Sequence, residues 1–159
     1  MTTRAGIGYD IHRRVEGRPL ILGGVRFDSP WGLAGHSDAD VLCHAIGDAL
    51  LGAAALGDLG THFPPADPRW RDASSLDLLA RIAALLRGRG SRIVNVDAMV
   101  VAEAPQLAPV RAAMLANLGR ALGIDPSQVS VKATTNEGLG TIGRGEGIAA
   151  WAVAMVEMA

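Results

Sequence analysis

The sequence predicts an α/β domain of the α+β type, with a mixed four-stranded sheet, helices on one face of the sheet and a small hairpin. Three observations favour this fold class. Strand and helix patterns follow one another along 159 residues, a length typical of one domain. Three amphipathic helical segments are enough to cover one face of a small sheet. The last strand is apolar on both faces, so we expect residues 1–159 to form a single domain whose other sheet face packs against further subunits.

The first part of the chain contains a strand, a hairpin and a helix. Apolar residues in 5–12 predict the first strand. The Gly-Gly pair within residues 20–27 separates two short apolar arms, which is typical of a hairpin. Ser37 and Asp40 have the spacing of a capping box, so we expect a helix over about residues 38–56.

In the rest of the chain, a segment rich in glycine and proline is followed by helix and strand patterns. Glycine and proline recur through residues 57–70 and predict a long loop, a kind of segment that is often functional in a compact domain. Residues 74–90 have the pattern of an amphipathic helix. The remaining elements are a strand over 92–103, a helix over 109–122 capped by Gly123, a strand over 127–135 and a last strand over 147–158.

Charge and cysteine content exclude several classes of protein. The 15 Lys and Arg nearly balance the 16 Asp and Glu, for a formal net charge of -1, so we expect no nucleic-acid partner and no membrane partner. Cys43 is the single cysteine, which excludes an intrachain disulfide and favours a reducing compartment. No segment has the pattern of a signal peptide or of a membrane-spanning helix. We therefore expect a cytoplasmic protein.

Two short polar patterns predict a metal site. Asp10 and His12 are two residues apart on the first strand, so their side chains point to the same side. On the following helix, Asp40, His44 and Asp48 recur every four residues, and the two carboxylates could orient the imidazole between them. Asp10, His12 and His44 would supply one oxygen and two nitrogen ligands. Three protein ligands and an open fourth position are typical of catalytic zinc.

Each pattern also has a plainer interpretation. A solvated strand end and a solvated helix face explain the two patterns separately, and neither pattern alone would favour a metal. Cys43 is a competing ligand, but on a helix it points about 100° away from His44. We therefore interpret Cys43 as a buried thiol and His62, which has no partner in the sequence, as non-ligating.

A second concentration of polar residues lies in KATTNEGLGTIGRGEG, residues 132–147. Two threonines and an asparagine supply hydrogen-bond donors there, and Glu137 supplies a hard oxygen ligand suited to magnesium. Glycines surround Arg144, so the backbone and the guanidinium could both approach an anion. A turn between strands is the plainer alternative, because neither a Walker A sequence nor a dinucleotide-binding fingerprint is present.

Six motifs resemble, in order and spacing, the 2-C-methyl-D-erythritol 2,4-cyclodiphosphate synthase family over nearly the whole chain. They are GYDIH, GHSDADVLCHAIGDALLGAAALGDLG, FP followed by Asp, NVDAMVVAEAP, VKATTNEGLG and GRGEGIA. The resemblance implies a phosphorus–oxygen lyase of the non-mevalonate isoprenoid pathway. Such an enzyme converts 4-diphosphocytidyl-2-C-methyl-D-erythritol 2-phosphate to 2-C-methyl-D-erythritol 2,4-cyclodiphosphate and CMP. It also implies a homotrimer with active sites between subunits and a central cavity for an isoprenoid diphosphate.

The resemblance assigns roles to individual residues. It implies zinc on Asp10, His12 and His44, and magnesium or manganese on Glu137 together with the substrate diphosphate. It also implies catalytic roles for the phosphate-binding His36 and for Thr135. The implied substrate-binding residues are Ser37, Asp58, Leu59, Gly60, Phe63, Pro64, Pro65, Ala66, Asp67, Ala102, Glu103, Ala104, Pro105, Gln106, Leu107, Ala108, Thr134, Asn136, Thr141 and Arg144. Of these, residues 58–60 would hold the ribose, 63–67 the methylerythritol part and 102–108 the cytosine.

Three residues depart from the family pattern. Pro65 stands where Asp is common, Gln106 where Lys is common and Thr141 where Phe is common. They support one alternative, a trimeric metal-dependent protein that binds nucleotides or isoprenoid diphosphates without turnover. A zinc phosphohydrolase ranks last, because nothing in the sequence predicts a dinuclear metal site.

Overall fold

The computed structural model describes all residues, 1–159, and contains a mixed sheet of the expected kind. Two long antiparallel strands form its centre, β1 (Thr2–Glu16) and β7 (Gly147–Met158), paired from Thr2↔Met158 to Arg13↔Gly147. β5 (Arg92–Val101) continues the sheet antiparallel to β7, and β6 (Val129–Thr134) runs parallel to β5. The sheet has five strands rather than four, because β4 (Trp31–Leu33) pairs with the end of β1. Three residues are too few to show a strand period in the sequence.

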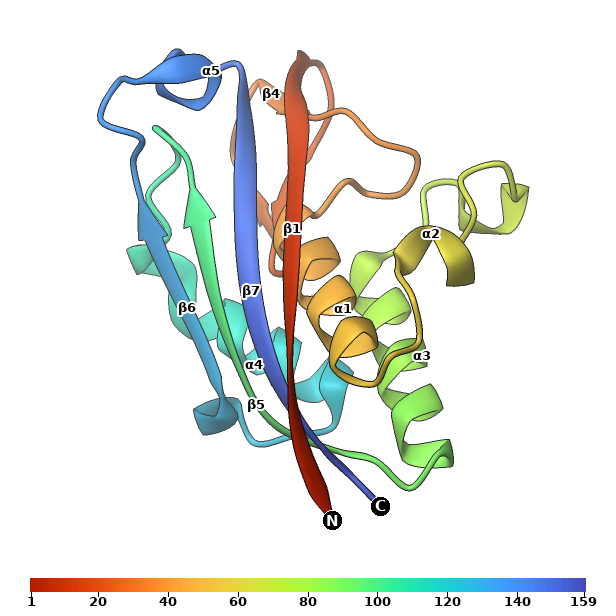
Figure 1. Ribbon diagram of the computed structural model, residues 1–159. Helices are drawn as coiled ribbons and strands as arrows, with labels where there is room; N and C mark the ends of the chain where they lie inside the picture. The colour runs from red at the N-terminus through yellow and green to blue at the C-terminus, as the bar shows by residue number, and fades with distance from the viewer.

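All three long helices lie on the same side of the sheet, as predicted (Figure 1). They are α1 (Val41–Ala53), α3 (Ser75–Gly88) and α4 (Arg111–Leu122). Helix α1 packs across β1 and β7, and α3 and α4 pack against each other. Both chain termini lie at one end of the molecule, while the short helix α5 (Gly140–Gly143) lies at the other (Figure 1). No helix is long and apolar enough to cross a membrane.

The close packing of α1 on β1 depends on glycine. A Cβ atom on Gly8 would stand 1.8 Å from the carbonyl oxygen of Ala45, and one on Gly6 would stand 2.0 Å from that of Ala49. Backbone atoms cannot move aside as a side chain can, so these two positions exclude larger residues. The helix can therefore lie directly on the strand that carries Asp10 and His12.

The Gly-Gly hairpin prediction is confirmed. Strands β2 (Leu20–Leu22) and β3 (Val25–Phe27) pair antiparallel, with Leu22 opposite Val25. The two turn residues, Gly23 and Gly24, have φ angles of 56° and 71°. A two-residue turn with positive φ at both positions matches the twist of the flanking strands, and glycine adopts it without steric cost.

Helix α1 is shorter than the predicted span of 38–56. Ala39 has a left-handed φ of 58°, which interrupts a right-handed helix, and Ala55 has a φ of 56° beyond the other end. The predicted capping box of Ser37 and Asp40 is wrong. Asp40 is itself the N-cap, and its carboxylate accepts from the backbone N–H of Cys43.

Short helical turns interrupt the predicted loops. The loop over 57–70 contains α2 (Leu59–His62) and the 3-10 turn η1 (Pro68–Trp70). Helix α4 begins after another such turn, η2 (Ala108–Val110), and η3 (Pro126–Gln128) precedes β6. Gly123 caps α4 in the left-handed conformation with a φ of 69°, as predicted.

The far face of the sheet carries none of the three long helices, and only the short α5 packs at one end of it, through Ile142 against Val101 and Ala149. Apolar side chains of β1 and β7 are exposed on it, with Ile7 71% exposed, Trp151 42% and Val153 45%. Tyr9 and Trp151 pack against each other with ring centroids 4.6 Å apart. We call this surface, made of Ile7, Tyr9, Ile11, Trp151 and Val153, the open face. Monomeric proteins seldom leave contiguous apolar surface of this kind uncovered.

Candidate metal and substrate site

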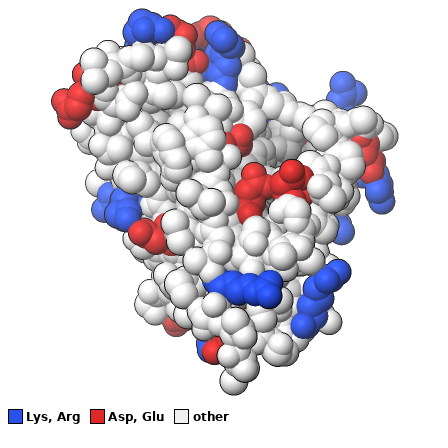
Figure 2. Space-filling view, viewed as in Figure 1, with Lys and Arg blue, Asp and Glu red and all other residues white.

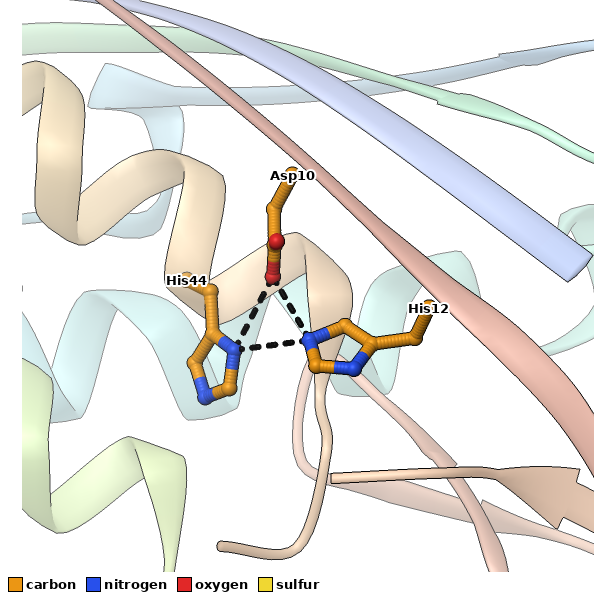
Figure 3. Close-up of side chains that lie close together, drawn as sticks. All are labelled: Asp10, His12 and His44. Atoms are coloured by element: carbon orange, nitrogen blue, oxygen red, sulfur yellow. Dashed lines mark hydrogen bonds and ion pairs between the residues drawn. The ribbon is translucent and has the colours of Figure 1, made fainter. Parts of the chain in front are cut away.

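Asp10, His12 and His44 converge at the end of the helix-covered face (Figure 3). Asp10 and His12 point from β1 toward α1, and His44 points from the first turns of α1 toward β1. The Oδ2 atom of Asp10 lies 2.8 Å from Nε2 of His12 and 3.0 Å from Nδ1 of His44. The two imidazole nitrogens are 3.2 Å apart. The predicted constellation therefore forms from two elements that are distant in the sequence.

The outer nitrogen of each imidazole also has a partner. The Nδ1 atom of His12 faces the carbonyl oxygen of Ala34. A carbonyl only accepts, so this nitrogen carries a proton, and Nε2 is the nitrogen left to bind a metal beside Asp10. The Nε2 atom of His44 lies 3.1 Å from the hydroxyl of Ser37 and 2.9 Å from the hydroxyl of Ser75. Such outer contacts fix the orientation of metal-binding histidines.

The chemistry of this donor set fits a metal ion. Burial acts to raise the pKa of Asp10, but hydrogen bonds and charge from His12 and His44 outweigh it and hold that pKa at about 2. Burial lowers the pKa of His12, while the hydrogen bond to Asp10 raises it, and the net shift is upward. The three donor atoms are spaced 2.8–3.2 Å apart. A tetrahedral ion with bonds of about 2.0–2.1 Å has ligand edges of about 3.3 Å, so one ion fits with little movement.

The triad forms part of the wall of a pocket of about 250 Å³. Figure 2 shows acidic side chains gathered beside a hollow in the visible face. Besides Asp48, the pocket includes nine of the residues predicted for the site. These nine are Asp10, His12, His36, Ser37, His44, Leu59, Gly60, Phe63 and Pro65. A metal at the triad would thus face the residues predicted to bind phosphate and sugar.

The remaining predicted segments meet at another place. The backbone N–H of Ala102 donates to the carbonyl of Thr134, and Gly138 N–H donates to the carboxylate of Glu103. These contacts join residues 102–108 to residues 134–144 at the ends of β5 and β6. No residue of either segment lines the pocket of the triad. Within one chain, the predicted site is therefore divided into two parts.

Residues 3–157 match the YgbB family. A 2-C-methyl-D-erythritol 2,4-cyclodiphosphate synthase from Symbiobacterium thermophilum is 60% identical over 151 residues, which cover 95% of this chain and 96% of the relative. The chain belongs to this family. A solved structure of IspF from Plasmodium falciparum in complex with CDP is 35% identical, with a TM-score of 0.85 and coverage of 98% of this chain and 96% of the other. The bifunctional IspDF of Campylobacter jejuni has a TM-score of 0.95 and 40% identity, and the match covers 99% of this chain and 43% of that one.

The orienting role predicted for Asp40 is corrected. Its carboxylate is fully buried and accepts from the backbone N–H groups of Gly23, Gly24 and Cys43. It therefore holds the β2–β3 turn against the start of α1 and is not bound to His44. Asp40 lies before the first residue of α1, so it is not on the polar helix face that it was predicted to share with His44 and Asp48.

Asp48 lines the pocket but also has a structural bond. Its carboxylate accepts from the backbone N–H of Leu59 at 2.8 Å and so anchors the start of α2. Burial raises the pKa of Asp48. Asp58 caps the same helix by accepting from Thr61 at 2.9 Å, and these hydrogen bonds lower the pKa of Asp58. Both carboxylates therefore shape the segment that contains Leu59 and Gly60.

Three residues that contact the site were missed in the sequence. Trp70 and Leu78 line the pocket, and Ser75 contacts His44. Trp70 packs edge-on against Phe63 with ring centroids 5.0 Å apart, and its indole nitrogen is buried without a hydrogen-bond partner. The scarcity of aromatics, 4% of the chain, could have drawn attention to Trp70. Nothing in the sequence distinguishes Ser75 from its neighbour Ser74.

Other predicted residues occupy less enclosed positions. Thr141 lines a different pocket, beside Ile11 on the open face, and Arg144 donates to Glu146 at 2.7 Å. Asp67 forms an ion pair with Arg69 outside the pocket.

Cys43 is buried, and burial raises the pKa of its thiol well above the ordinary value. The Nε2 atom of His62 contacts the carbonyl of Leu56, and neither Cys43 nor His62 belongs to the triad.

Proposed function

We propose that this chain converts 4-diphosphocytidyl-2-C-methyl-D-erythritol 2-phosphate to 2-C-methyl-D-erythritol 2,4-cyclodiphosphate and CMP. The observation that carries the proposal is the metal-binding triad in the wall of one pocket with His36 and Ser37. Relatives of nearly the same length that are 60% identical are named as synthases of this product. Two solved structures of relatives are described as CDP complexes.

The reaction requires no nucleophile from the protein. An oxygen of the substrate's 2-phosphate attacks the β-phosphorus, and the bond from that phosphorus to the bridging oxygen breaks. CMP leaves with the bridging oxygen, which makes the enzyme a phosphorus–oxygen lyase. A phosphate monoester has its second pKa near 6 and is largely ionised at neutral pH. The protein must therefore bring two anionic groups together in line, and alignment can supply up to about 7–11 kcal/mol.

Zinc is the metal we assign to Asp10, His12 and His44. One oxygen and two nitrogen ligands are typical of catalytic zinc sites. When bound there, the metal would neutralise charge on the diphosphate and polarise the phosphorus. His36 and Ser37 line the same pocket, so they are placed to bind the phosphate oxygens and orient them. Asp48, through the N–H of Leu59, would hold the segment that contacts the ribose.

The complete site would form between subunits of a homotrimer. The divided site within one chain and the apolar open face both support this assembly. A neighbouring subunit would bring its residues 102–108 for cytosine and its Thr134–Glu137 for the diphosphate. In this arrangement Glu137 would bind magnesium and Thr135 would stand near the developing charge.

Phosphorus NMR of the purified protein with zinc, magnesium and the proposed substrate tests this function. A cyclic diphosphate appearing with equimolar CMP is the expected result. This result would also mean that the three departures from the family pattern, Pro65, Gln106 and Thr141, are compatible with turnover. Unchanged substrate in the presence of bound metal would overturn the proposal and favour a binding protein without turnover.

The variant His44→Ala tests the metal site without removing the fold. We expect the variant to lose zinc and to lose at least about 100-fold in turnover, because the metal supplies several kcal/mol of transition-state stabilisation. The assembly should persist, because His44 lies apart from the open face. His62→Ala is the matched control and should keep wild-type zinc content by atomic absorption. Wild-type zinc content in His44→Ala would refute the ligand assignment.

A further inference from the structure

Ser75 occupies an unusual position at the start of α3. It is 1% exposed, and both its hydrogen-bonding donors bind one carboxylate. Its backbone N–H donates to Oδ2 of Asp38 at 2.9 Å, and its hydroxyl donates to Oδ1 of the same residue. The neighbouring Ser74 makes no capping bond with its side chain. Of these two neighbouring serines, only the buried Ser75 binds Asp38.

The same hydroxyl also reaches the metal site. Oγ of Ser75 lies 2.9 Å from Nε2 of His44, the nitrogen that faces away from Asp10 and His12. A serine hydroxyl has a single proton, and here the hydroxyl donates it in the hydrogen bond to the carboxylate of Asp38. The oxygen is then left to accept a hydrogen bond from Nε2–H of His44. Asp38, Ser75 and His44 thus form one hydrogen-bonded chain with a defined direction.

We propose that Ser75 and Asp38 are positioning residues for His44, which hold its proton on Nε2 and its lone pair on Nδ1. Nδ1 is the atom that lies 3.0 Å from Asp10 and 3.2 Å from the facing nitrogen of His12. A metal requires that lone pair, and a carboxylate acting through the hydroxyl increases the basicity of the ring. Ser37 also contacts Nε2, at 3.1 Å, but its hydroxyl is not bound to a carboxylate.

The surrounding bonds make this chain rigid. The backbone N–H of Asp38 donates to the carbonyl of Ala73, and that of Asp72 donates to the carbonyl of His36. The carboxylate of Asp38 also accepts from the N–H of Asp40 at 3.1 Å. The start of α3 is therefore tied to the segment that carries His36 as well as to the ring of His44. The inference deepens the proposed function, since it concerns the metal on which that function rests.

Zinc affinity is the first readout, measured on the full-length protein by competition with a chromophoric chelator. We expect Ser75→Ala to lower the affinity by about 10–100-fold, the usual effect of removing the partner of a metal-binding histidine. Asp38→Asn keeps the shape of the side chain but removes its charge, and it should lower the affinity by a smaller factor. Ser74→Ala is the matched control and should bind zinc as the wild type does.

The Nε2–H proton of His44 is the second readout, measured by ¹H–¹⁵N NMR on the zinc-loaded protein, because without a metal the ionised Asp10 favours a proton on Nδ1. In the wild type this proton should be slow to exchange with solvent, and in Ser75→Ala it should exchange faster. Unchanged zinc affinity together with unchanged exchange of this proton in Ser75→Ala would overturn the proposal, even if turnover fell. Neither readout depends on turnover. A wild-type protein that binds zinc but forms no cyclic product would refute the proposed function alone.

Discussion

The two faces of β1 differ in what covers them, although their residues alternate along one strand. Gly6, Gly8, Asp10 and His12 face α1, where the glycines admit the helix and the polar pair meets His44. Ile7, which lies between the glycines, is 71% exposed on the open face. The covered face is completed by this chain alone, and the metal triad forms there. The open face is apolar without a covering layer, which is the arrangement expected of a surface that another copy completes.

The largest effect is expected on the covered face, from Gly8→Ala. The added Cβ would stand 1.8 Å from the carbonyl oxygen of Ala45, so α1 must separate from β1. We expect a loss of at least about 3 kcal/mol in the free energy of unfolding, the upper part of the range for overpacking. Urea denaturation of the metal-free protein measures it.

Gly52→Ala is the matched control for Gly8→Ala. Gly52 lies on α1 itself, and a Cβ there would meet only the carbonyl of Ile7, at 3.8 Å. Alanine is favoured over glycine inside a helix, so this variant should gain up to about 1 kcal/mol. Equal effects of the two substitutions would contradict the close packing described for β1.

Trp151→Glu tests the open face. Trp151 is already 42% exposed in the single chain, so the fold should tolerate the charge with a change of about 1 kcal/mol or less. The assembly should dissociate, because a carboxylate would be buried without a partner among apolar side chains. Sedimentation velocity at micromolar concentration would detect the loss of the proposed trimer. Arg26→Glu, on β3 and away from this face, should leave the assembly intact, and a trimer that survives Trp151→Glu would argue against the open face as the interface.

Arg18 binds the segment that contains His36, at the end of the covered face. Its guanidinium donates to the carbonyl of Gly35 at 2.8 Å and to that of Ser37. Arg18→Met removes both bonds, and we expect a loss of about 1–3 kcal/mol in the free energy of unfolding. Arg26→Met is a suitable control, since Arg26 is exposed on β3. If both variants unfold at the same urea concentration, Arg18 does not stabilise this segment.

Local patterns in the sequence predicted much of this molecule. The hairpin followed from a Gly-Gly pair, the end of α4 from Gly123, and the last strand from an apolar run that begins at Gly147. Asp10 and His12 could be paired because residues two apart share one side of a strand. His44 was added because it is one of only four histidines and belongs to the second polar pattern, and because the family resemblance implied the same three ligands.

The errors at the start of α1 have a common physical cause, which is that tertiary contacts determine where this helix begins. Asp38 binds Ser75, 37 residues away, and Asp40 binds the turn at Gly23 and Gly24. A sequence window around residue 38 contains neither partner, so the helix was placed too early and Asp40 was assigned to the wrong contact. Ser75 was missed for the same reason, because its role depends on His44.

The smallest effect is expected at the polar ion pair between Asp97 on β5 and Lys132 on β6. Their charged atoms are 2.7 Å apart and about half exposed. The hydrogen bond from Lys132 lowers the pKa of Asp97 below its ordinary value. A lowered pKa means that the pair contributes stability at neutral pH and loses it as the pH falls below the ordinary range of Asp. Solvent screening limits the contribution of an exposed pair, so Lys132→Met should change the free energy of unfolding by no more than about 0.5 kcal/mol at pH 7. The difference from wild type should narrow further on acidification. A loss of more than 2 kcal/mol in urea denaturation, comparable to that expected for Gly8→Ala, would mean that this part of the sheet is buried by a neighbouring subunit rather than exposed to solvent.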